Sequence, residues 1–226
     1  MTNLATQAPV LVTGASGYIA SWVIQKLLTQ GYTVHATVRD LNKTQSFAHL
    51  SKIADSSAGT LKLFKANLLE PNSFKEAMQG CEIVFHMASP FVVTNYKDAV
   101  KDIIEPAVLG TENVLNTVNE TESVKRVIVT SSIASTYGDA IDILKTDHNT
   151  FNESHWNTSS SETHQPYPDS KVMAERKAWE MAEAQDRWQL VCINPALVFG
   201  RSLTPNTQSG SIEVLQQFTN GLTLAG

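Results

Sequence analysis

The feature that most constrains the fold is a regular alternation of short apolar runs with longer segments of helical periodicity. Several of the short runs are almost continuously apolar, which is typical of parallel strands covered on both faces. Strands that alternate with helices form βαβ units with right-handed crossovers, and such units assemble into a doubly wound sheet. We therefore predict an α/β, Rossmann-type parallel sheet with helices on both faces. The predicted strands are residues 9–13, 32–38, 61–66, 82–88, 126–132 and 189–195.

Between and after these runs lie six segments with helical spacing of apolar residues. Gly31 and Gly80 directly follow the first and third of them, where glycine is favoured as a helix terminator. Residues 138–166 break the alternation, because they are polar and have no clear period; so long a loop in a compact domain is usually functional or mobile. The predicted helices are residues 19–30, 43–53, 73–78, 100–120, 170–184 and 212–220.

Size, charge and cysteine content narrow the class of protein. The chain has 226 residues, 42% of them hydrophobic, which is enough for a globular core. A net charge of −5 argues against a nucleic-acid partner. No apolar run approaches the ~20 residues that span a bilayer, and the first residues lack the features of a signal peptide. We expect a soluble, cytoplasmic protein with no membrane partner, in which Cys81 and Cys192 are reduced and buried.

The segment VLVTGASGYIASW, residues 10–22, contains a glycine-rich turn between the first strand and the first helix. Gly14 allows a tight turn with positive φ, Gly17 lets the backbone approach a pyrophosphate, and a small Ala20 lets the helix pack close to the sheet. The helix N-terminus offers free N–H groups to the anion. A purely structural turn is the alternative. The predicted cofactor contacts of this turn are Gly14, Ser16, Gly17, Tyr18 and Ile19.

The end of the second strand predicts which dinucleotide binds. This position faces the adenosine ribose in doubly wound sheets, and an acidic residue here favours NAD. The chain instead has Arg39, followed by Asp40 and, one turn on, by Lys43. A guanidinium suits a 2′-phosphate through charge and stacking, so we predict NADP(H). A solvated Arg39–Asp40 pair is the alternative.

In the segment YPDSK, Tyr167 and Lys171 stand at positions i and i+4 of a helix, on one face and one turn apart. A nearby ammonium stabilises tyrosinate and lowers the phenol pKa toward the working pH. Such a tyrosine can protonate a carbonyl oxygen while a hydride reaches the carbon. Ser132, or its neighbour Ser131, follows the fifth strand and could hydrogen-bond the same oxygen. The alternatives are a surface helix pair and a hydrogen-bonded strand end.

The histidines do not have the spacing of a metal site. His148, His155 and His164 are irregularly placed in the polar loop. His35 and His86 fall within predicted strands, where packing in the core is expected. We predict no metal.

Seven segments of the chain resemble, in order, those of the extended short-chain dehydrogenases/reductases. These are TGASGYIA, VRD, HMASPF, EPAVLGTENVL, VTSSIAS, YPDSK and INPALVFG, and they cover nearly the whole chain. Within that family the chain looks most like the dihydroflavonol reductase-like and yeast methylglyoxal/carbonyl reductase branch. The segment FNESHWN, residues 151–157, supports this branch.

The resemblance implies roles for individual residues. Tyr167 would be the general acid, Lys171 the partner that lowers its pKa, and Ser132 the donor that orients the carbonyl. The implied further cofactor contacts are Ala88 and Ser89 near the ribose and pyrophosphate, Pro195 and Val198 at the nicotinamide, and Asn67 with Leu68 near the adenine. Asn67 departs from the aspartate that the family usually has, although an amide oxygen can accept the same hydrogen bond. Phe91 would contact the substrate together with Ser132 and Tyr167.

The resemblance also implies a division of the chain. Residues 1–200 would form the NADP-binding domain with the catalytic residues, and residues 201–226 would begin a C-terminal substrate-binding segment. Family members continue further, so this segment is short or missing here. Either the sequence is a truncated form, or the substrate pocket is built from residues 90–96, residues 138–166 and the last helix. By analogy alone the protein is a monomer or a homodimer.

The expected function is reduction of aldehydes and ketones to alcohols with NADPH as the hydride donor. Two alternatives remain open at this point. One is a nucleotide-sugar epimerase or dehydratase that retains NAD, against which Arg39 argues. The other is a protein that senses NADP(H) without turnover, against which the Ser132, Tyr167 and Lys171 set argues.

Overall fold

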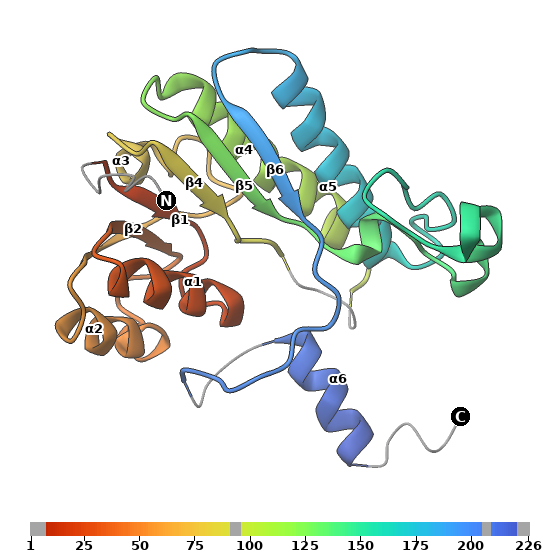
Figure 1. Cartoon of the computed structure of the whole chain (residues 1–226), viewed down its shortest axis with the longest axis horizontal. Helices are drawn as coiled ribbons and strands as arrows, with labels where there is room; N and C mark the ends of the chain where they lie inside the picture. Colours follow the sequence, from red (N-terminus) through yellow and green to blue (C-terminus); the bar gives the residue numbers. More distant parts are fainter. Residues whose placement is uncertain (1–7, 91–95, 205–208, 221–226) are drawn as a thin grey trace.

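A computed structural model describes residues 8–90, 96–204 and 209–220. These residues contain a parallel sheet of six strands in the order β3-β2-β1-β4-β5-β6 (Figure 1). All six predicted strands are confirmed, each within a few residues of its expected bounds. The strands are β1 (Val10–Val12), β2 (Thr33–Val38), β3 (Thr60–Lys65), β4 (Ile83–His86), β5 (Arg126–Thr130) and β6 (Gln189–Ile193).

The strand order reverses direction between β1 and β4. In the register of the sheet, Val12 of β1 stands between Ala36 of β2 and Phe85 of β4. The chain runs from β1 outward through β2 and β3, then returns to β4 on the other side of β1 and continues to β6. In open parallel sheets this reversal separates the loops at the carboxyl ends of the strands and leaves a crevice where ligands bind.

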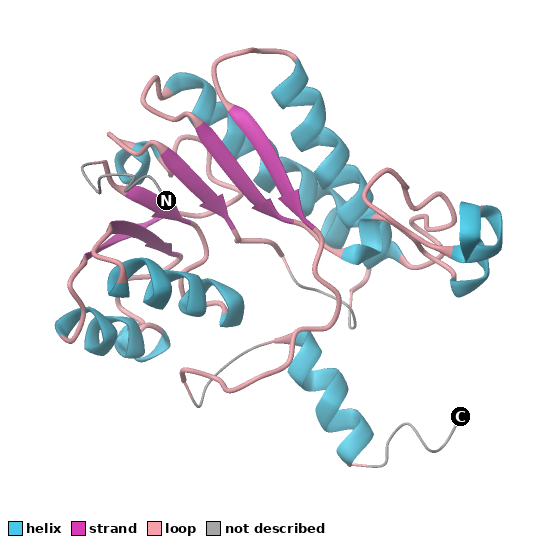
Figure 2. Cartoon of the chain, in the orientation of Figure 1, coloured by secondary structure: helices cyan, strands magenta, loops and turns pink. Residues whose placement is uncertain are grey.

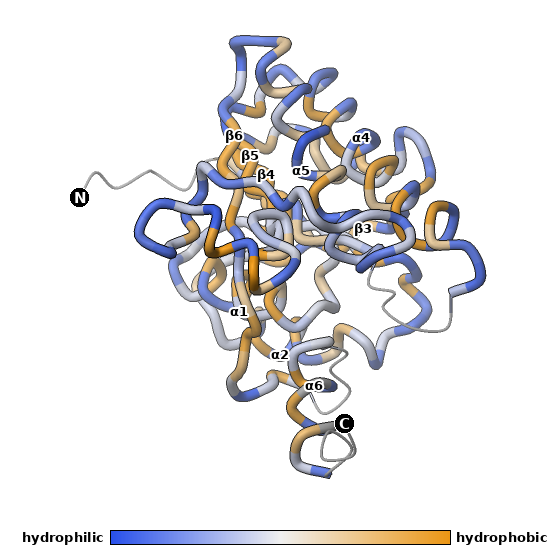
Figure 3. Tube along the Cα trace, turned by 90° about the vertical axis from the view of Figure 1, so that its right-hand side faces the viewer, coloured by the Kyte–Doolittle hydropathy of each residue, from blue (hydrophilic) through white to orange (hydrophobic). Residues whose placement is uncertain are grey.

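Helices cover both faces of the sheet, as predicted (Figure 2). Successive side chains of a strand point to opposite faces, so Leu11 and Val12 belong to different apolar cores. Leu11 packs with residues of α3 (Lys75–Met78), α4 (Glu105–Glu120) and α5 (Pro166–Glu183). Val12 packs with residues of α1 (Tyr18–Thr29) and α2 (Ala48–Asp55). The hydrophobic colour therefore follows the central strands, whereas the peripheral loops are hydrophilic (Figure 3).

The edge strand β6 departs from the expectation that every strand is covered on both faces. Val191 and Ile193 are 39% and 49% exposed, while Leu190 and Cys192 pack against the core beneath α4 and α5. The reason is that α1 and α2 lie over β1 and β2, at the other end of the sheet. Cys81 is a buried free thiol, but Cys192 is only half-buried, which corrects the prediction for that residue.

Three predicted helices match the structure within two residues at each end, and the other three differ more strongly. The predicted helix 170–184 begins earlier, at Pro166, because proline is tolerated in the first turn, where N–H groups have no helical partner. The predicted helix 43–53 is a 3₁₀ turn, Thr44–Ser46, followed by α2, since Phe47 at φ −133° interrupts it. The predicted helix 100–120 is a π turn, Val100–Ile104, followed by α4, at a point where Pro106 lacks the N–H of a regular ladder.

The polar segment 138–166 contains two 3₁₀ turns, Ala140–Lys145 and Asp147–Asn149. Asp139 and Asp142 cap the first turn reciprocally, and the Ser159 hydroxyl donates to the Asp142 carboxylate at 2.6 Å. Polar hydrogen bonds thus order this segment in place of an apolar core. The last described helix is α6 (Gly210–Thr219). No helix within the described ranges is long and apolar enough to cross a membrane.

Candidate active site

The residues singled out in the sequence follow the carboxyl ends of the strands, along one edge of the sheet. The glycine turn follows β1, Arg39 follows β2 and Asn67 follows β3. On the other side of the reversal, Ala88 and Ser89 follow β4, Ser132 follows β5 and Pro195 follows β6. Tyr167 and Lys171 lie in the first two turns of α5. Phe91 lies outside the described residues.

The turns after β1 and β4 touch each other. Gly14 has φ +68°, and a Cβ built on it would lie 2.9 Å from the Cα of Ala88. Glycine is therefore required at this position both for its backbone conformation and for close approach. Gly17 is the N-cap of α1, which has no side-chain cap and no acidic residue in its first turn. The N-terminus of α1 thus keeps the donors and the positive dipole end that an anion requires.

A buried threonine and histidine hold these two turns together. The Thr13 hydroxyl accepts hydrogen bonds from the backbone N–H groups of Met87 and Ala88, at 3.0 and 2.9 Å. Its own proton is directed to Nδ1 of His86, 3.1 Å away, which places the imidazole proton on Nε2. Burial, and next the charge of Lys171, lower the pKa of His86 to about 4, so the ring is neutral. His86 lies in the core as expected, whereas the role of Thr13 was not predicted.

Lys171 is buried at the junction of α5 and the turn after β4. Its ammonium donates to the Ser89 hydroxyl at 2.7 Å and lies 5.3 Å from the centre of the Tyr167 ring. Burial lowers the pKa of Lys171 to about 8, which leaves it predominantly charged at pH 7. Burial also raises the pKa of Tyr167. This corrects the expectation of a lowered phenol pKa, because in this structure desolvation of the ring outweighs the attraction of the lysine.

The structure distinguishes Ser132 from Ser131. The Ser131 hydroxyl donates to the carboxylate of Glu175 on α5, at 2.5 Å. The Ser132 oxygen accepts from the backbone N–H of Ala134 at 3.2 Å, and no described group takes its proton. The proton of Ser131 is therefore used within the fold, whereas that of Ser132 is not taken by any described residue.

Four residues were expected near the adenosine half, and their surroundings differ. Lys43 is exposed. Arg39 is exposed and makes no ion pair with Asp40 or any other described residue, so the paired alternative is not observed. The Asn67 side-chain oxygen accepts from the backbone of Leu69 at 3.2 Å, which uses one of its lone pairs. The Leu68 carbonyl accepts from Asn113 of α4 at 2.7 Å, so its backbone is tied to that helix.

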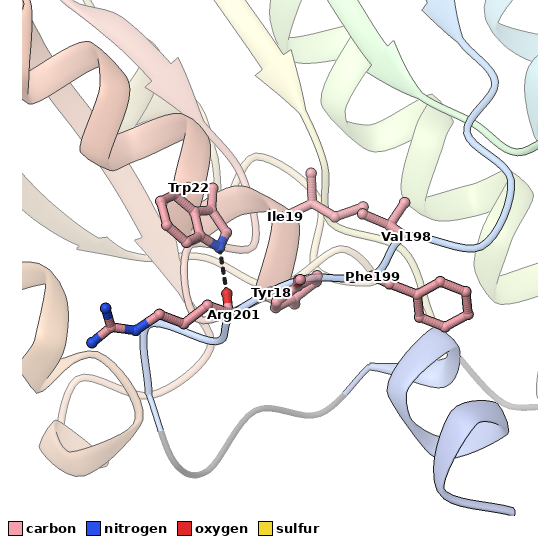
Figure 4. Close-up of a pocket in the computed structure, with 7 residues that line it drawn as sticks. Tyr18, Ile19, Trp22, Val198, Phe199 and Arg201 are labelled. Carbon is pink, nitrogen blue, oxygen red and sulfur yellow. Dashed lines mark hydrogen bonds between the residues drawn. The ribbon is translucent and has the colours of Figure 1, made fainter. Parts of the chain in front are cut away.

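A cavity of about 360 Å³ lies between the start of α1 and the chain that follows β6 (Figure 4). Tyr18, Ile19 and Val198 line it, which brings together residues singled out at opposite ends of the sequence. The indole N–H of Trp22 donates to the Arg201 carbonyl at 3.0 Å and closes one side. Four lining residues were not predicted from the sequence. Of these, Trp22 could have been found, because it lies one helical turn after Tyr18 and therefore on the same face of α1. The missed lining residues are Trp22, Phe199, Gly200 and Arg201.

Taken together, this edge of the sheet has the groups for proton transfer to an oxygen beside an anion site. A phenol and a buried ammonium come from α5, and a serine hydroxyl whose proton no described group takes comes from the turn after β5. The N-terminus of α1 has no side-chain cap, so its backbone N–H groups could bind an anion. Within residues 8–90, 96–204 and 209–220, no three histidine, cysteine or acidic side chains gather as a metal site would require.

Comparison with known proteins agrees with this geometry. Residues 10–224 match the NAD dependent epimerase/dehydratase family. A cinnamoyl-CoA reductase from Medicago truncatula is 43% identical over 208 residues, covering 90% of this chain and 62% of the relative. An anthocyanidin reductase from Arabidopsis thaliana is 40% identical over 217 residues, covering 93% of this chain and 61% of the relative.

Among solved structures, yeast methylglyoxal/isovaleraldehyde reductase in complex with NADPH superimposes with a TM-score of 0.73. It is 29% identical, and the match covers 86% of this chain and 59% of that structure. The chain thus spans about six-tenths of the length of the curated relatives it matches.

Proposed function

Because this chain belongs to the NAD-dependent epimerase/dehydratase family, we propose that it reduces aldehydes and ketones to alcohols with NADPH as the hydride donor. The observation that carries the proposal is the arrangement around α5. Tyr167 at its first turn and the buried Lys171, bonded to Ser89, adjoin the strand end where Ser132 keeps a free hydroxyl proton. The similarity to reductases from plants and yeast supports the same reaction class.

The residues after β1 and β2 fit a phosphorylated dinucleotide. The uncapped start of α1 would hold the pyrophosphate, and the unpaired Arg39 with the exposed Lys43 would hold a 2′-phosphate. Ala88 and Ser89 would border the ribose, and Pro195 with Val198 would pack at the nicotinamide. When bound, NADPH supplies the hydride. In this proposal residues 1–200 form the cofactor-binding domain, and residues 201–226 begin the substrate-binding segment.

The protein's own groups manage the oxygen of the substrate. The hydroxyls of Ser132 and Tyr167 would hold the carbonyl oxygen, on which negative charge develops as the hydride reaches the carbon. Tyr167 would donate its proton to that oxygen, and the Lys171 ammonium would stabilise the tyrosinate that remains. Burial raises the pKa of Tyr167, which keeps the phenol protonated before the reaction but makes it a weaker acid, so the charge of Lys171 is needed to assist the transfer. Solvent then returns the proton to Tyr167.

The first test is NADPH oxidation by the purified protein with a panel of aldehydes, 2-oxoaldehydes and ketones, with NADH in parallel. We expect turnover that is faster with NADPH. Tight NAD binding with no carbonyl reduction would favour a nucleotide-sugar epimerase or dehydratase. NADP(H) binding with no turnover on any carbonyl would favour a sensing protein. Either of those results would contradict the proposed function.

Arg39→Asp tests the cofactor preference in the same assay. The substitution replaces a cation that attracts the 2′-phosphate by a carboxylate that repels it and accepts from a ribose hydroxyl. We expect the ratio of kcat/KM for NADPH to that for NADH to fall by roughly 100-fold, which corresponds to the loss of about 3 kcal/mol of charge-assisted bonding. Lys52→Asp makes the same change in net charge at an exposed site on α2 and is the control. An unchanged ratio in Arg39→Asp would remove Arg39 from the site.

A further inference from the structure

A buried glutamate on α5 collects hydrogen bonds from three separate segments. Glu175 is 7% exposed and lies one helical turn beyond Lys171. One of its carboxylate oxygens, Oε2, accepts from the Ser131 hydroxyl at 2.5 Å and the Ser135 hydroxyl at 2.6 Å. It also accepts from the side-chain amide of Asn194 at 2.8 Å. The donors come from the end of β5, the 3₁₀ turn Ile133–Ser135 and the residue after β6.

The same donors hold the backbone of Ser132. The amide of Asn194 lies 3.1 Å from the Ser132 carbonyl oxygen, and the Ser135 hydroxyl lies 2.7 Å from it. Ser132 itself is the extended N-cap of the 3₁₀ turn, with φ −159° and ψ 151°. The side chain of Ser131 is bonded to Glu175, and the Ser132 carbonyl is bonded to two groups that also contact Glu175. Glu175 thus helps to hold the backbone of Ser132 in place.

The number of hydrogen-bond donors around residue 175 explains why this position needs a carboxylate, which only accepts hydrogen bonds. The Ser131 and Ser135 hydroxyls each bring one proton, and the Asn194 amide brings two. The acceptors that they share are the Ser132 carbonyl, the Ser135 hydroxyl oxygen and Glu175. A neutral amide at position 175 could turn its own N–H groups toward these donors. No described lysine, arginine or histidine forms an ion pair with Glu175. Burying an acid without a cation is costly, so its three hydrogen bonds must offset the desolvation.

We propose that Glu175 is a positioning residue that sets the Ser132 hydroxyl against the carbonyl substrate, an inference that rests on the proposed reductase function. Tyr167, Lys171 and Glu175 follow one another at intervals of four residues, so they share one face of α5. A single rigid helix then carries the proton donor, its ammonium partner and the anchor of the serine turn. This fixes the separation of Tyr167 from Ser132, which must both reach one oxygen atom.

The anchoring is tested by amide hydrogen exchange in Glu175→Gln, which does not depend on enzymatic activity. We expect the peptide spanning residues 131–136 to exchange about tenfold faster than in the parent, while residues 10–17 are unchanged. Glu183→Gln, at the exposed end of the same helix, should leave both peptides unchanged. Unaltered exchange of residues 131–136 in Glu175→Gln would overturn the proposal. Should that variant fail to fold, Asn194→Ala removes one of the bonds to Glu175 and the amide bond to the Ser132 carbonyl, and its exchange is judged by the same criterion.

The effect on turnover is tested by a double-mutant cycle with Ser132→Ala, using the full chain and its best carbonyl substrate. Glu175→Gln should lower kcat/KM roughly tenfold, leave the Kd for NADPH unchanged and have no further effect once Ser132 is alanine. An equal loss in both backgrounds would show that Glu175 does not act through Ser132 and would overturn the proposal. An inactive parent would instead refute the proposed function, and the exchange experiment would still decide whether Glu175 anchors the serine turn.

Discussion

Burial shifts the pKa of three titratable residues beside α5 and leaves each in a protonation state that the proposed reaction can use. It raises the pKa of Tyr167, which therefore retains the proton to be donated. It lowers the pKa of Lys171 only to about 8, so the ammonium persists at neutral pH. It lowers the pKa of His86 to about 4, which prevents a second positive charge from forming next to Lys171. The three residues are thus in the protonation states that the proposed reaction needs before any ligand binds.

The neutral His86 predicts a pH dependence of stability. Its pKa is about 4 in the folded protein and 6.5 when unperturbed, so between these values the unfolded chain binds a proton that the folded chain does not. Stability therefore falls as the pH drops from 6.5 to 4, by about 3 kcal/mol from this residue. Urea unfolding across this range should show a shallower decline for His86→Asn, whose amide oxygen can still accept from Thr13. The pKa values of His35 and His49 are also lowered by burial, but these residues contribute equally to the pH dependence of parent and variant. Parallel declines in the two proteins would therefore contradict the role given to His86.

At the scale of elements, the contact between the turns after β1 and β4 is the least tolerant part of the site. Gly14 combines positive φ with a backbone neighbour, Ala88, where a Cβ would be placed. Gly31, at the end of α1, has φ +87° but nothing within 4 Å of the same position. Substituting Gly31 therefore measures the loss of stability from a left-handed backbone alone, whereas substituting Gly14 adds the loss from steric overlap with Ala88.

We predict that Gly14→Ala lowers the free energy of unfolding by roughly 2–4 kcal/mol, because strain and overlap add. Gly31→Ala should cost about 1 kcal/mol, from conformational strain alone. Chemical denaturation of both variants measures the difference. Equal losses would mean that the turn after β4 moves away freely and that the two turns are not held together.

Local rules predicted the elements well and their ends less well. The order of strands and helices follows from periodicity, and the two glycines that end α1 and α3 were recognised by position. The start of α5 was placed four residues late, at Ser170, although Tyr167 and Lys171 were expected at positions i and i+4 of a helix. Pro166 begins this helix because the N–H groups of a first turn have no helical partner. Phe47 was placed inside a helix that its backbone interrupts, and nothing local signals that break.

At the scale of the whole molecule, the sheet brings residues that follow its six strands to one edge. This grouping could be predicted from the sequence, because the carboxyl ends of parallel strands lie at the same edge of a sheet. What the sequence did not predict are contacts between residues far apart in the chain. Thr13 reaches His86 across 73 positions, and Ser131 reaches Glu175 across 44. Desolvation of Tyr167 likewise depends on the assembled fold, so the direction of its pKa shift was predicted wrongly. Motifs thus located the candidate site, and tertiary packing determined its electrostatics.

The most direct test of the central claim compares turnover and cofactor binding in Tyr167→Phe, which removes only the phenol proton. We predict that the Kd for NADPH stays within about twofold of the parent value while kcat for carbonyl reduction falls by roughly 100-fold to 10,000-fold. Tyr32→Phe, a half-buried tyrosine just before β2, controls for the loss of a hydroxyl elsewhere and should leave both values unchanged. Carbonyl reduction by Tyr167→Phe at the parent rate would contradict the assignment of Tyr167 as the proton donor.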